Sequence, residues 1–344
     1  MFHNSMKKIL FSATTLVAVI SLVLAGCGDD NDSEGASSTE KPLIVVTTNI
    51  LGDVVTNMVG DSFDVETIMP PGSDPHDFQA SAQQVQTMMS ADLLIVNGAN
   101  FEEGMLDVIE NAESDGVMIF EAISVVSQLE GSDDHGHDDH DDHEGHDDHE
   151  GHDDHEGHEG HEGHDHGGID PHFFTDPAQM AVVAQELSEF LVANFPDADQ
   201  GFVSTANDYV KQLQALDSEV EETLSAISSG ERLLVTNHAV FAYFADRYSF
   251  TVLGEIIPSS STLASASAQQ LASLAEEIKE NQVKAIFADA SSSDALAQTL
   301  ADEVSGVEVI NLYTESLGDP GSAGESYIDM IRFNAEAIAS ALVG

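Results

Sequence analysis

Short apolar runs that suit buried strands alternate with helical patterns along the chain, and this alternation constrains the fold most strongly. The runs are rich in Val, Ile and Leu, which is typical of strands covered on both faces. Alternating strands and helices predict a parallel sheet with helices on both sides. In the first block we expect strands at residues 42–49, 63–69, 93–97 and 117–120, and helices at 50–59, 80–90 and 101–111.

A second block of the same kind follows two helical patterns, at residues 178–194 and 196–228. The second of these would be about 45 Å long, enough to cross a whole domain. The sequence therefore predicts an α/β protein with two doubly wound lobes of parallel sheet and one long helix between them. The expected strands are 233–236, 283–288 and 307–312, and the expected helices are 239–248, 267–280, 293–304 and 325–342.

The N-terminus has the pattern of a bacterial lipoprotein signal. Lys7 and Lys8 precede a short apolar run at residues 9–24, and the sequence LAGC ends at Cys27, the single cysteine. A basic start, a short apolar stretch and small residues before a break are typical of a secretory signal. An uncleaved membrane helix with an incidental cysteine is the alternative, but the run is short for a span. We expect an extracytoplasmic protein, anchored to the membrane through lipidated Cys27.

These patterns divide the chain into five predicted segments. They are a signal peptide at 1–26, the lipidated cysteine with a flexible tether at 27–41, an N-terminal α/β lobe at 42–199, a linking helix at 200–228 and a C-terminal α/β lobe at 229–344.

Charge excludes one large class of partners. The chain has 63 Asp and Glu against 9 Lys and Arg, a formal net charge of -54. Non-specific binding to nucleic acid requires clustered cations that replace counterions. We therefore expect no nucleic-acid partner, and any membrane attachment must be covalent or hydrophobic because an anionic bilayer would repel the chain.

An acidic, histidine-rich insertion occupies residues 131–168 of the first lobe. It has no apolar residues that could offset the entropy of ordering, so we expect disorder without a ligand. Clustered imidazoles and carboxylates can bind a borderline-soft cation, and a solvated insertion without such a role is the alternative. The twelve candidate auxiliary ligands are His135, His137, His140, His143, His146, His149, His152, His155, His158, His161, His164 and His166.

Three further histidines, His76, His172 and His238, lie in the parts expected to fold. Each falls in a loop at the end of a predicted strand or at a lobe junction, where open α/β sheets bind ligands. Three imidazoles and one further ligand form a common Zn²⁺ site. His76 and His172 both end an Asp-Pro-His motif, and we expect Asp74 and Asp170 to orient the two imidazoles.

Four segments carry a resemblance to a known family. Residues 72–77 (GSDPHD), 170–177 (DPHFFTDP), 236–244 (TNHAVFAYF) and 313–318 (YTESLG) follow one another in that order. Everything after the tether resembles the substrate-binding lipoproteins of bacterial zinc and manganese ABC importers, the ZnuA type. The resemblance implies two lobes joined by a rigid long helix, with a metal site at their interface. It implies the ligands His76, His172, His238 and Glu315.

The chain departs from that family pattern at two places. A tryptophan that is usual in the second segment is replaced by Phe173 or Phe174, and the family often has aspartate where this chain has Glu315. Asp289, at the end of a predicted strand, is a rival for the fourth ligand, and Glu255 is a weaker one.

The resemblance also bears on the metal and on partners. Manganese-selective relatives tend to have a carboxylate at the position of His238, and a three-imidazole set suits Zn²⁺ better than the harder Mn²⁺. We therefore expect Zn²⁺ in preference to Mn²⁺ or Fe²⁺. The implied partners of this monomer are a membrane permease and its cytoplasmic ATPase.

Two other classes of protein remain as alternatives at this point. A three-histidine zinc site with bound water could be hydrolytic. The sequence has no His-Glu-x-x-His helix and no Gly-x-Ser-x-Gly turn, so we do not expect an enzyme. A surface zinc buffer or an adhesin without a transporter is the other alternative.

Overall fold

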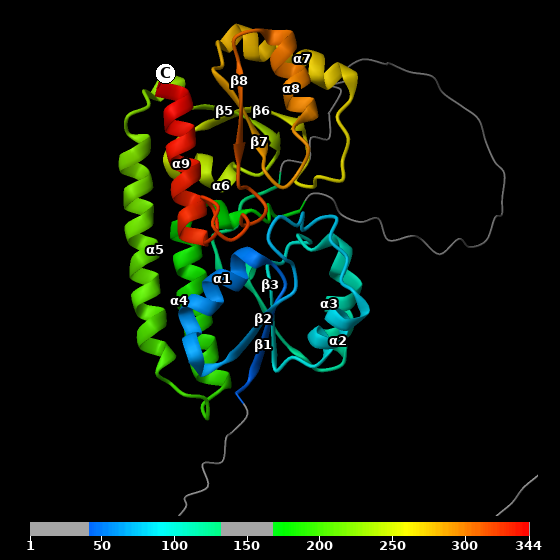
Figure 1. Ribbon diagram of the computed structural model, residues 1–344, viewed down its shortest axis with the longest axis vertical. Helices are drawn as coiled ribbons and strands as arrows, with labels where there is room; N and C mark the ends of the chain where they lie inside the picture. The colour runs from blue at the N-terminus through cyan, green and yellow to red at the C-terminus, as the bar shows by residue number, and fades with distance from the viewer. Residues whose placement is uncertain (1–40, 132–167, 344) are drawn as a thin grey trace, which may run out of the picture. The chain divides into compact units, whose positions relative to one another are not determined.

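Two four-stranded sheets, each entirely parallel, form the core of the protein. The computed structural model describes residues 41–131 and 168–343 (Figure 1). The predicted signal peptide, Cys27 and the twelve histidines of the insertion lie outside the described residues. The predicted fold class, α/β with two doubly wound parallel sheets, is confirmed.

The first sheet has the strand order β2-β1-β3-β4. Its central strand β3 is buried at every position, as expected for an apolar strand covered on both faces. Local signals fix the helices: the Thr48 hydroxyl caps the first of them, and Ser81 and Gln84 form a capping box at the second. The elements are β1 (Leu43–Val46), α1 (Asn49–Val59), β2 (Asp64–Thr67), α2 (Ala82–Met89), β3 (Leu93–Val96), α3 (Leu106–Ser114) and β4 (Met118–Glu121).

The second sheet repeats this arrangement in the order β6-β5-β7-β8. Strand β6 is absent from the sequence-based expectation, which had only three strands here. Gly254 and Glu255 interrupt its apolar pattern, and its pairing with β5 shifts register between Leu234 and Val235. The elements are β5 (Leu233–His238), α6 (Ala242–Tyr248), β6 (Thr251–Ile257), α7 (Ala268–Asn281), β7 (Ala285–Asp289), α8 (Ala295–Val304), β8 (Glu308–Leu312) and α9 (Tyr327–Val343).

The long helix α5 is shorter than predicted. It covers Phe202–Leu224, 23 residues, or about 34 Å, after α4 (Pro177–Asn194). The predicted start at Pro196 is wrong because a turn intervenes: the Gln200 amide donates to the carbonyls of Phe195 and Ala198. Helix α5 packs against α4, α1 and α9, and therefore contacts helices of both blocks (Figure 1).

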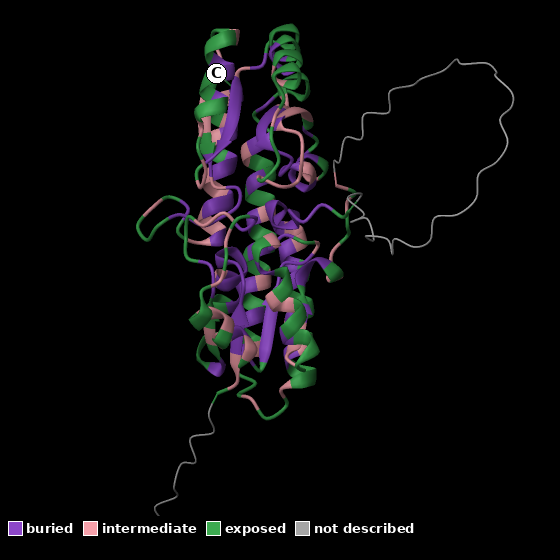
Figure 2. Ribbon diagram, turned by 90° about the vertical axis from the view of Figure 1, so that its right-hand side faces the viewer, coloured by how far each residue is buried: buried purple, intermediate pink, exposed green. Residues whose placement is uncertain are grey.

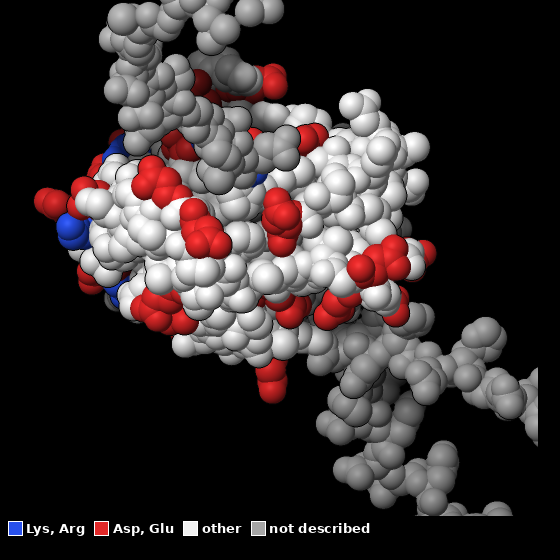
Figure 3. All heavy atoms as spheres, turned by 90° about the horizontal axis from the view of Figure 1, so that it is seen from below, with Lys and Arg blue, Asp and Glu red and all other residues white. Residues whose placement is uncertain are grey.

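Ion pairs add to the packing of the second block against α5. The Arg247 guanidinium of α6 donates to Asp217, and the Arg332 guanidinium of α9 makes two hydrogen bonds with Glu219, at 2.7 and 3.1 Å. Acidic side chains are spread over the face seen in Figure 3, where few basic ones are visible. Arg247 and Arg332, two of the nine basic residues of the chain, therefore make contacts between helices.

Burial follows the layers of the fold. The central strands β1, β3, β5 and β7 and the inward helix faces are buried, whereas the edge strands and the outward helix faces are more exposed (Figure 2). In each sheet the strand order reverses direction between the two central strands, β1 and β3 or β5 and β7, and loops beyond the carboxyl ends of such strands bind ligands. Among the residues described, no helix is long and apolar enough to cross a membrane.

Candidate metal centre

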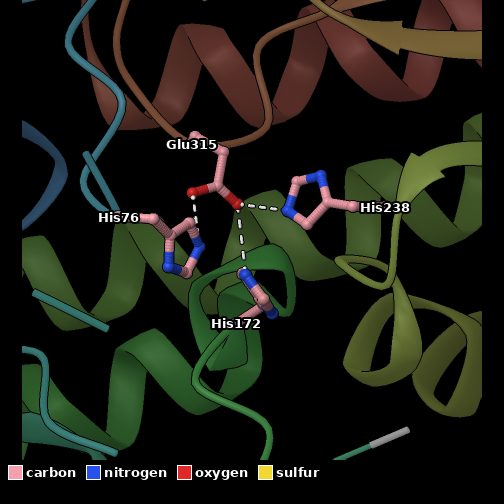
Figure 4. Close-up of side chains that lie close together, drawn as sticks. All are labelled: His76, His172, His238 and Glu315. Atoms are coloured by element: carbon pink, nitrogen blue, oxygen red, sulfur yellow. Dashed lines mark hydrogen bonds and ion pairs between the residues drawn. The ribbon is translucent and has the colours of Figure 1, made fainter. Parts of the chain in front are cut away.

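Four side chains from distant parts of the sequence meet between the two sheets. His76 follows β2, His172 precedes α4, His238 ends β5 and Glu315 follows β8. One ligand atom from each lies within 4.8 Å of the others, and all four residues are at most 2 % exposed. Figure 4 shows the three imidazoles turned toward the Glu315 carboxylate. The structure thus brings together all four residues that the sequence singled out.

The two Asp-Pro-His motifs orient their histidines differently. In both, the aspartate Oδ1 accepts the backbone N–H of its histidine, at 2.9 Å for Asp74 and 2.8 Å for Asp170. Asp170 also contacts His172 Nδ1 at 2.7 Å, as expected. The same expectation is wrong for Asp74, because Glu103 Oε1 contacts His76 Nδ1 at 3.0 Å. The second oxygen of Asp74 instead accepts the Thr262 hydroxyl at 2.8 Å.

Hydrogen bonds between loops fix Glu315 relative to His76. The Asn49 amide donates to Ser316 Oγ at 2.7 Å and accepts from the backbone N–H of Leu317 at 2.8 Å. Ser316 Oγ also accepts from the backbone N–H of Gly72, in the loop that carries His76. These bonds connect the two blocks directly at the site.

The Glu315 carboxylate lies against all three imidazoles. Its Oε1 is 2.8 Å from His238 Nε2 and 3.1 Å from His172 Nε2, and its Oε2 is 3.3 Å from His76 Nε2. Burial alone would raise the pKa of this carboxyl, but its electrostatic interactions with His238, His76 and His172 hold that pKa well below its usual value. Glu315 is therefore an anion in a buried cage of imidazoles.

Two of these imidazoles favour the protonated form in the protein without metal. Burial opposes a positive charge on His76, yet the charge of Glu315 and the hydrogen bonds to Glu103 and Glu315 raise the pKa of His76 to about 10. Burial likewise opposes protonation of His172, and the charges of Asp170 and Glu315 raise its pKa to about 9. The site therefore holds positive charge at neutral pH, which a metal ion would replace.

The donor atoms fit a cation. His76 Nε2, His172 Nε2 and Glu315 Oε2 are buried, and their contacts with one another and with Glu315 Oε1, at 3.1 and 3.3 Å, lack the geometry of full hydrogen bonds. Such atoms are costly unless something pairs with them. A cation held by three imidazole nitrogens and a carboxylate oxygen would satisfy them together, in a four-ligand set that Zn²⁺ accepts.

The rival carboxylates lie elsewhere. Asp289 is buried but falls outside the group of four, and its two oxygens accept the backbone N–H and the hydroxyl of Ser291, both at 2.8 Å. Burial and the nearby charge of Glu315 raise the pKa of Asp289 to about 6. Glu255 lies on β6, where it lines a separate depression with Ser273 and Glu277.

The sequence did not reveal Glu103 as a neighbour of the site. It lies 27 positions from His76, in a short helical turn after β3. Its proximity depends on β2 and β3, which lie on either side of β1 in the parallel sheet and end at the same edge, where the following loops meet. The acidic pair Glu102-Glu103 after a predicted strand was the only available signal.

Comparison with known proteins also indicates a metal-binding protein, in agreement with the geometry of the site. Residues 44–341 match the family described as "ZnuA: Zinc-uptake complex component A periplasmic". The chain is 26% identical over 345 residues to the manganese ABC transporter substrate-binding lipoprotein PsaA of Streptococcus anginosus, with 98% of this chain and 99% of the relative covered. It is 27% identical to the manganese-binding lipoprotein MntA of Halalkalibacterium halodurans, with the same coverage.

A solved structure agrees in fold. The periplasmic zinc binding protein TroA of Treponema pallidum superposes with a TM-score of 0.71 at 25% identity, covering 88% of this chain and 99% of that one. Fold and site therefore define a metal-binding protein of the two-sheet α/β type.

The chain belongs to the ZnuA family of metal-binding proteins. It is the extracytoplasmic substrate-binding component of a metal ABC importer, and it is not an enzyme.

Proposed function

We propose that this protein captures Zn²⁺ through His76, His172, His238 and Glu315 and delivers it to a membrane permease driven by a cytoplasmic ATPase. The observation that carries the proposal is the convergence of three buried Nε2 atoms on one buried carboxylate. Zn²⁺ is the cargo here, so the protein needs to bind and release it without chemical change.

The preference for Zn²⁺ rests on the donor atoms. Three imidazole nitrogens and one carboxylate suit Zn²⁺, whereas Mn²⁺ and other hard cations prefer sites rich in oxygen. His238 decides this balance, because a carboxylate in its place would give two oxygen ligands from side chains and only two nitrogens. Its Nε2 lies 2.8 Å from Glu315 Oε1, at the centre of the group.

Mn²⁺ is the second candidate, and one observation favours it. PsaA and MntA, which match nearly the whole chain, are both named for manganese. Glu315 also presents both oxygens to the imidazoles, and a carboxylate that binds through both would add an oxygen to the set. Fe²⁺ could bind the same donors.

We infer that Cys27 is lipidated and anchors a monomer to the outer face of the membrane through the tether that precedes residue 42. Support comes from the LAGC sequence and from relatives that are named lipoproteins. The adhesin and zinc-buffer alternatives would require no permease.

Metal uptake by cells tests this function. In cells that lack the gene, the wild-type protein should restore Zn²⁺ accumulation when zinc is scarce. A His238→Glu variant should restore it poorly, and its accumulation ratio of Zn²⁺ to Mn²⁺ should fall roughly tenfold, because an oxygen donor replaces a nitrogen donor. Normal Zn²⁺ uptake in cells without the protein would contradict the transport role, and an unchanged ratio would contradict the metal preference.

The histidine-rich insertion is proposed to bind further Zn²⁺ ions and to supply the main site when zinc is scarce. Twelve imidazoles beside carboxylates can hold several borderline-soft cations. Gly131 and Gly168, the first and last residues of the insertion, line the same pocket as His76. Ions bound there would be held at a high effective concentration near the site.

Deletion of residues 133–166 should lower the number of bound Zn²⁺ ions by several while leaving one ion at the buried site. Uptake should fall only when zinc is scarce, because an excess of ions saturates the main site directly. Native mass spectrometry gives the stoichiometry, and isotope uptake at low and high zinc gives the effect on transport. Unchanged stoichiometry together with unchanged uptake would show that the insertion has no such role.

A further inference from the structure

A pocket of about 610 Å³ adjoins the metal centre, and only one of the four candidate ligands reaches it. Within the described part of the chain, His76 lines this pocket, whereas His172, His238 and Glu315 do not. The side chains of these three residues are 0 % exposed. An ion that moves between solvent and the site through this pocket therefore passes His76.

Glu103 also lies between the pocket and the metal centre. It lines the pocket, its side chain is 32 % exposed, and its Oε1 lies 3.0 Å from His76 Nδ1. The opposite wall comes from the loop after β6, which includes Ser259 and Leu263 and is tied to the loop of His76 by the bond from Thr262 to Asp74. Glu103 can thus face solvent and His76 together.

Asp170 provides an internal comparison. It contacts Nδ1 of His172 as Glu103 contacts Nδ1 of His76, but it is 2 % exposed and lines no part of this pocket. Both carboxylates can orient an imidazole. Only Glu103 is also placed to meet a cation that arrives from solvent.

We propose that the metal ion enters and leaves through this pocket, and that Glu103 both positions His76 and contacts the ion in transit. The inference rests on the proposed function, since it takes the four-residue centre as the binding site. A carboxylate on the path attracts the cation before it loses its water. It also keeps a hydrogen-bond partner at His76 Nδ1 both before and after Nε2 binds the ion.

This role predicts a kinetic signature. A group that stabilises the ion in transit lowers the same barrier in both directions, so its loss slows binding and release equally and leaves Kd unchanged. A group that only orients a ligand stabilises the bound state, so its loss speeds release and weakens Kd. Glu103→Gln separates the two effects, because the amide oxygen still accepts from Nδ1–H while the charge is removed.

Rapid-mixing measurements on the full-length protein test the proposal, with Co²⁺ as the probe. Co²⁺ absorbs visible light strongly in a four-coordinate site and weakly when six-coordinate. Subtracting the signal of His238→Ala, which keeps the insertion, separates the buried site from ions on the insertion. For Glu103→Gln, the rates of Co²⁺ binding and of removal by a chelator should both fall roughly tenfold, with Kd within about threefold of wild type. Asp170→Asn should instead weaken Kd by about 10–100-fold, mainly through faster release.

A steric variant provides an independent measurement. Ala264 is exposed and lines the pocket, so Ala264→Trp should slow binding and release together, whereas Trp at the exposed Ala193 of α4 should change neither rate. If Glu103→Gln speeds release without slowing binding, or if neither Glu103→Gln nor Ala264→Trp changes the rates, the proposed passage is wrong. If wild-type protein gives no four-coordinate Co²⁺ spectrum, the binding site itself is wrong.

Discussion

Replacing Glu315 by glutamine is expected to weaken Zn²⁺ binding at least about 100-fold, more than the 10–100-fold that follows loss of a group supporting a ligand. Glu315 is the single anion in the group of four described side chains, and it contacts all three imidazoles. A neutral amide offers a weaker oxygen donor and leaves the charge of the ion uncompensated in a buried site. Isothermal titration with Zn²⁺ measures the loss.

The same substitution should also destabilise the metal-free protein. Glu315 compensates the positive charges on His76 and His172, and removal of one partner from a buried ion pair costs about 3–5 kcal/mol of unfolding free energy. Urea denaturation at pH 7 in the presence of a chelator measures this cost. The expected signature is therefore a joint loss of affinity and of metal-free stability.

Asp289→Asn is the matched control for Glu315→Gln. Asp289 is an equally buried carboxylate next to the site, but it binds Ser291 and lies outside the group of four. Its substitution should change Zn²⁺ affinity by less than about tenfold, as for a group that does not touch the ion. If Asp289→Asn abolished binding and Glu315→Gln did not, Asp289 would be the fourth ligand.

The affinity for Zn²⁺ is expected to rise steeply with pH. His76 and His172, with pKa values of about 10 and about 9, carry protons at neutral pH in the metal-free protein. Both protons must leave before the nitrogens can bind a metal. The association constant should therefore rise about 100-fold per pH unit between pH 6.5 and 8.5, with about two protons released per ion.

Titration calorimetry in buffers of different ionisation enthalpy counts these protons. A competing chelator of known pH dependence gives the affinity at each pH. An affinity that stays constant from pH 6.5 to 8.5 would contradict the account of the metal-free site.

The stability of the metal-free protein should change in the opposite direction. Both histidines have folded-state pKa values above the ordinary value of 6.5. Their protonation therefore stabilises the fold fully below pH 6.5, and this contribution is lost as pH rises through 9 and 10. The metal-free protein should melt at a lower temperature at pH 10 than at pH 7, and bound Zn²⁺ should remove most of this difference.

Much of the fold could be predicted because strong local patterns determine it. Strand β3 is a continuous apolar run, and α7 follows the N-cap residue Ser267, which forms a capping box with Gln270 three residues later in the sequence. Strand β6 was missed because Gly254 and Glu255 break its pattern. The start of α5 was misplaced because the turn at Gln200 depends on side-chain bonds to earlier carbonyls.

The candidate site could likewise be predicted only in part from the sequence. His76, His172, His238 and Glu315 could be found in the sequence because each lies in a motif of its own. The contacts that orient them are long-range, such as Glu103 with His76 and Asn49 with Ser316, which are 27 and 267 positions apart. The first pair follows from the strand order of the first sheet, and the second from the contact between the two blocks. Local sequence patterns contain neither kind of information.

The central claim is that the buried four-residue site selects Zn²⁺, and competition between two metals tests it directly. Native mass spectrometry of wild-type protein and of His238→Ala, each with equal Zn²⁺ and Mn²⁺, reports which ion is bound and how many. The wild-type protein should hold one more ion than the variant, and that ion should be Zn²⁺, since the insertion is common to both. If the additional ion is Mn²⁺, or if His238→Ala binds as many ions as the wild type, the proposed zinc site is wrong.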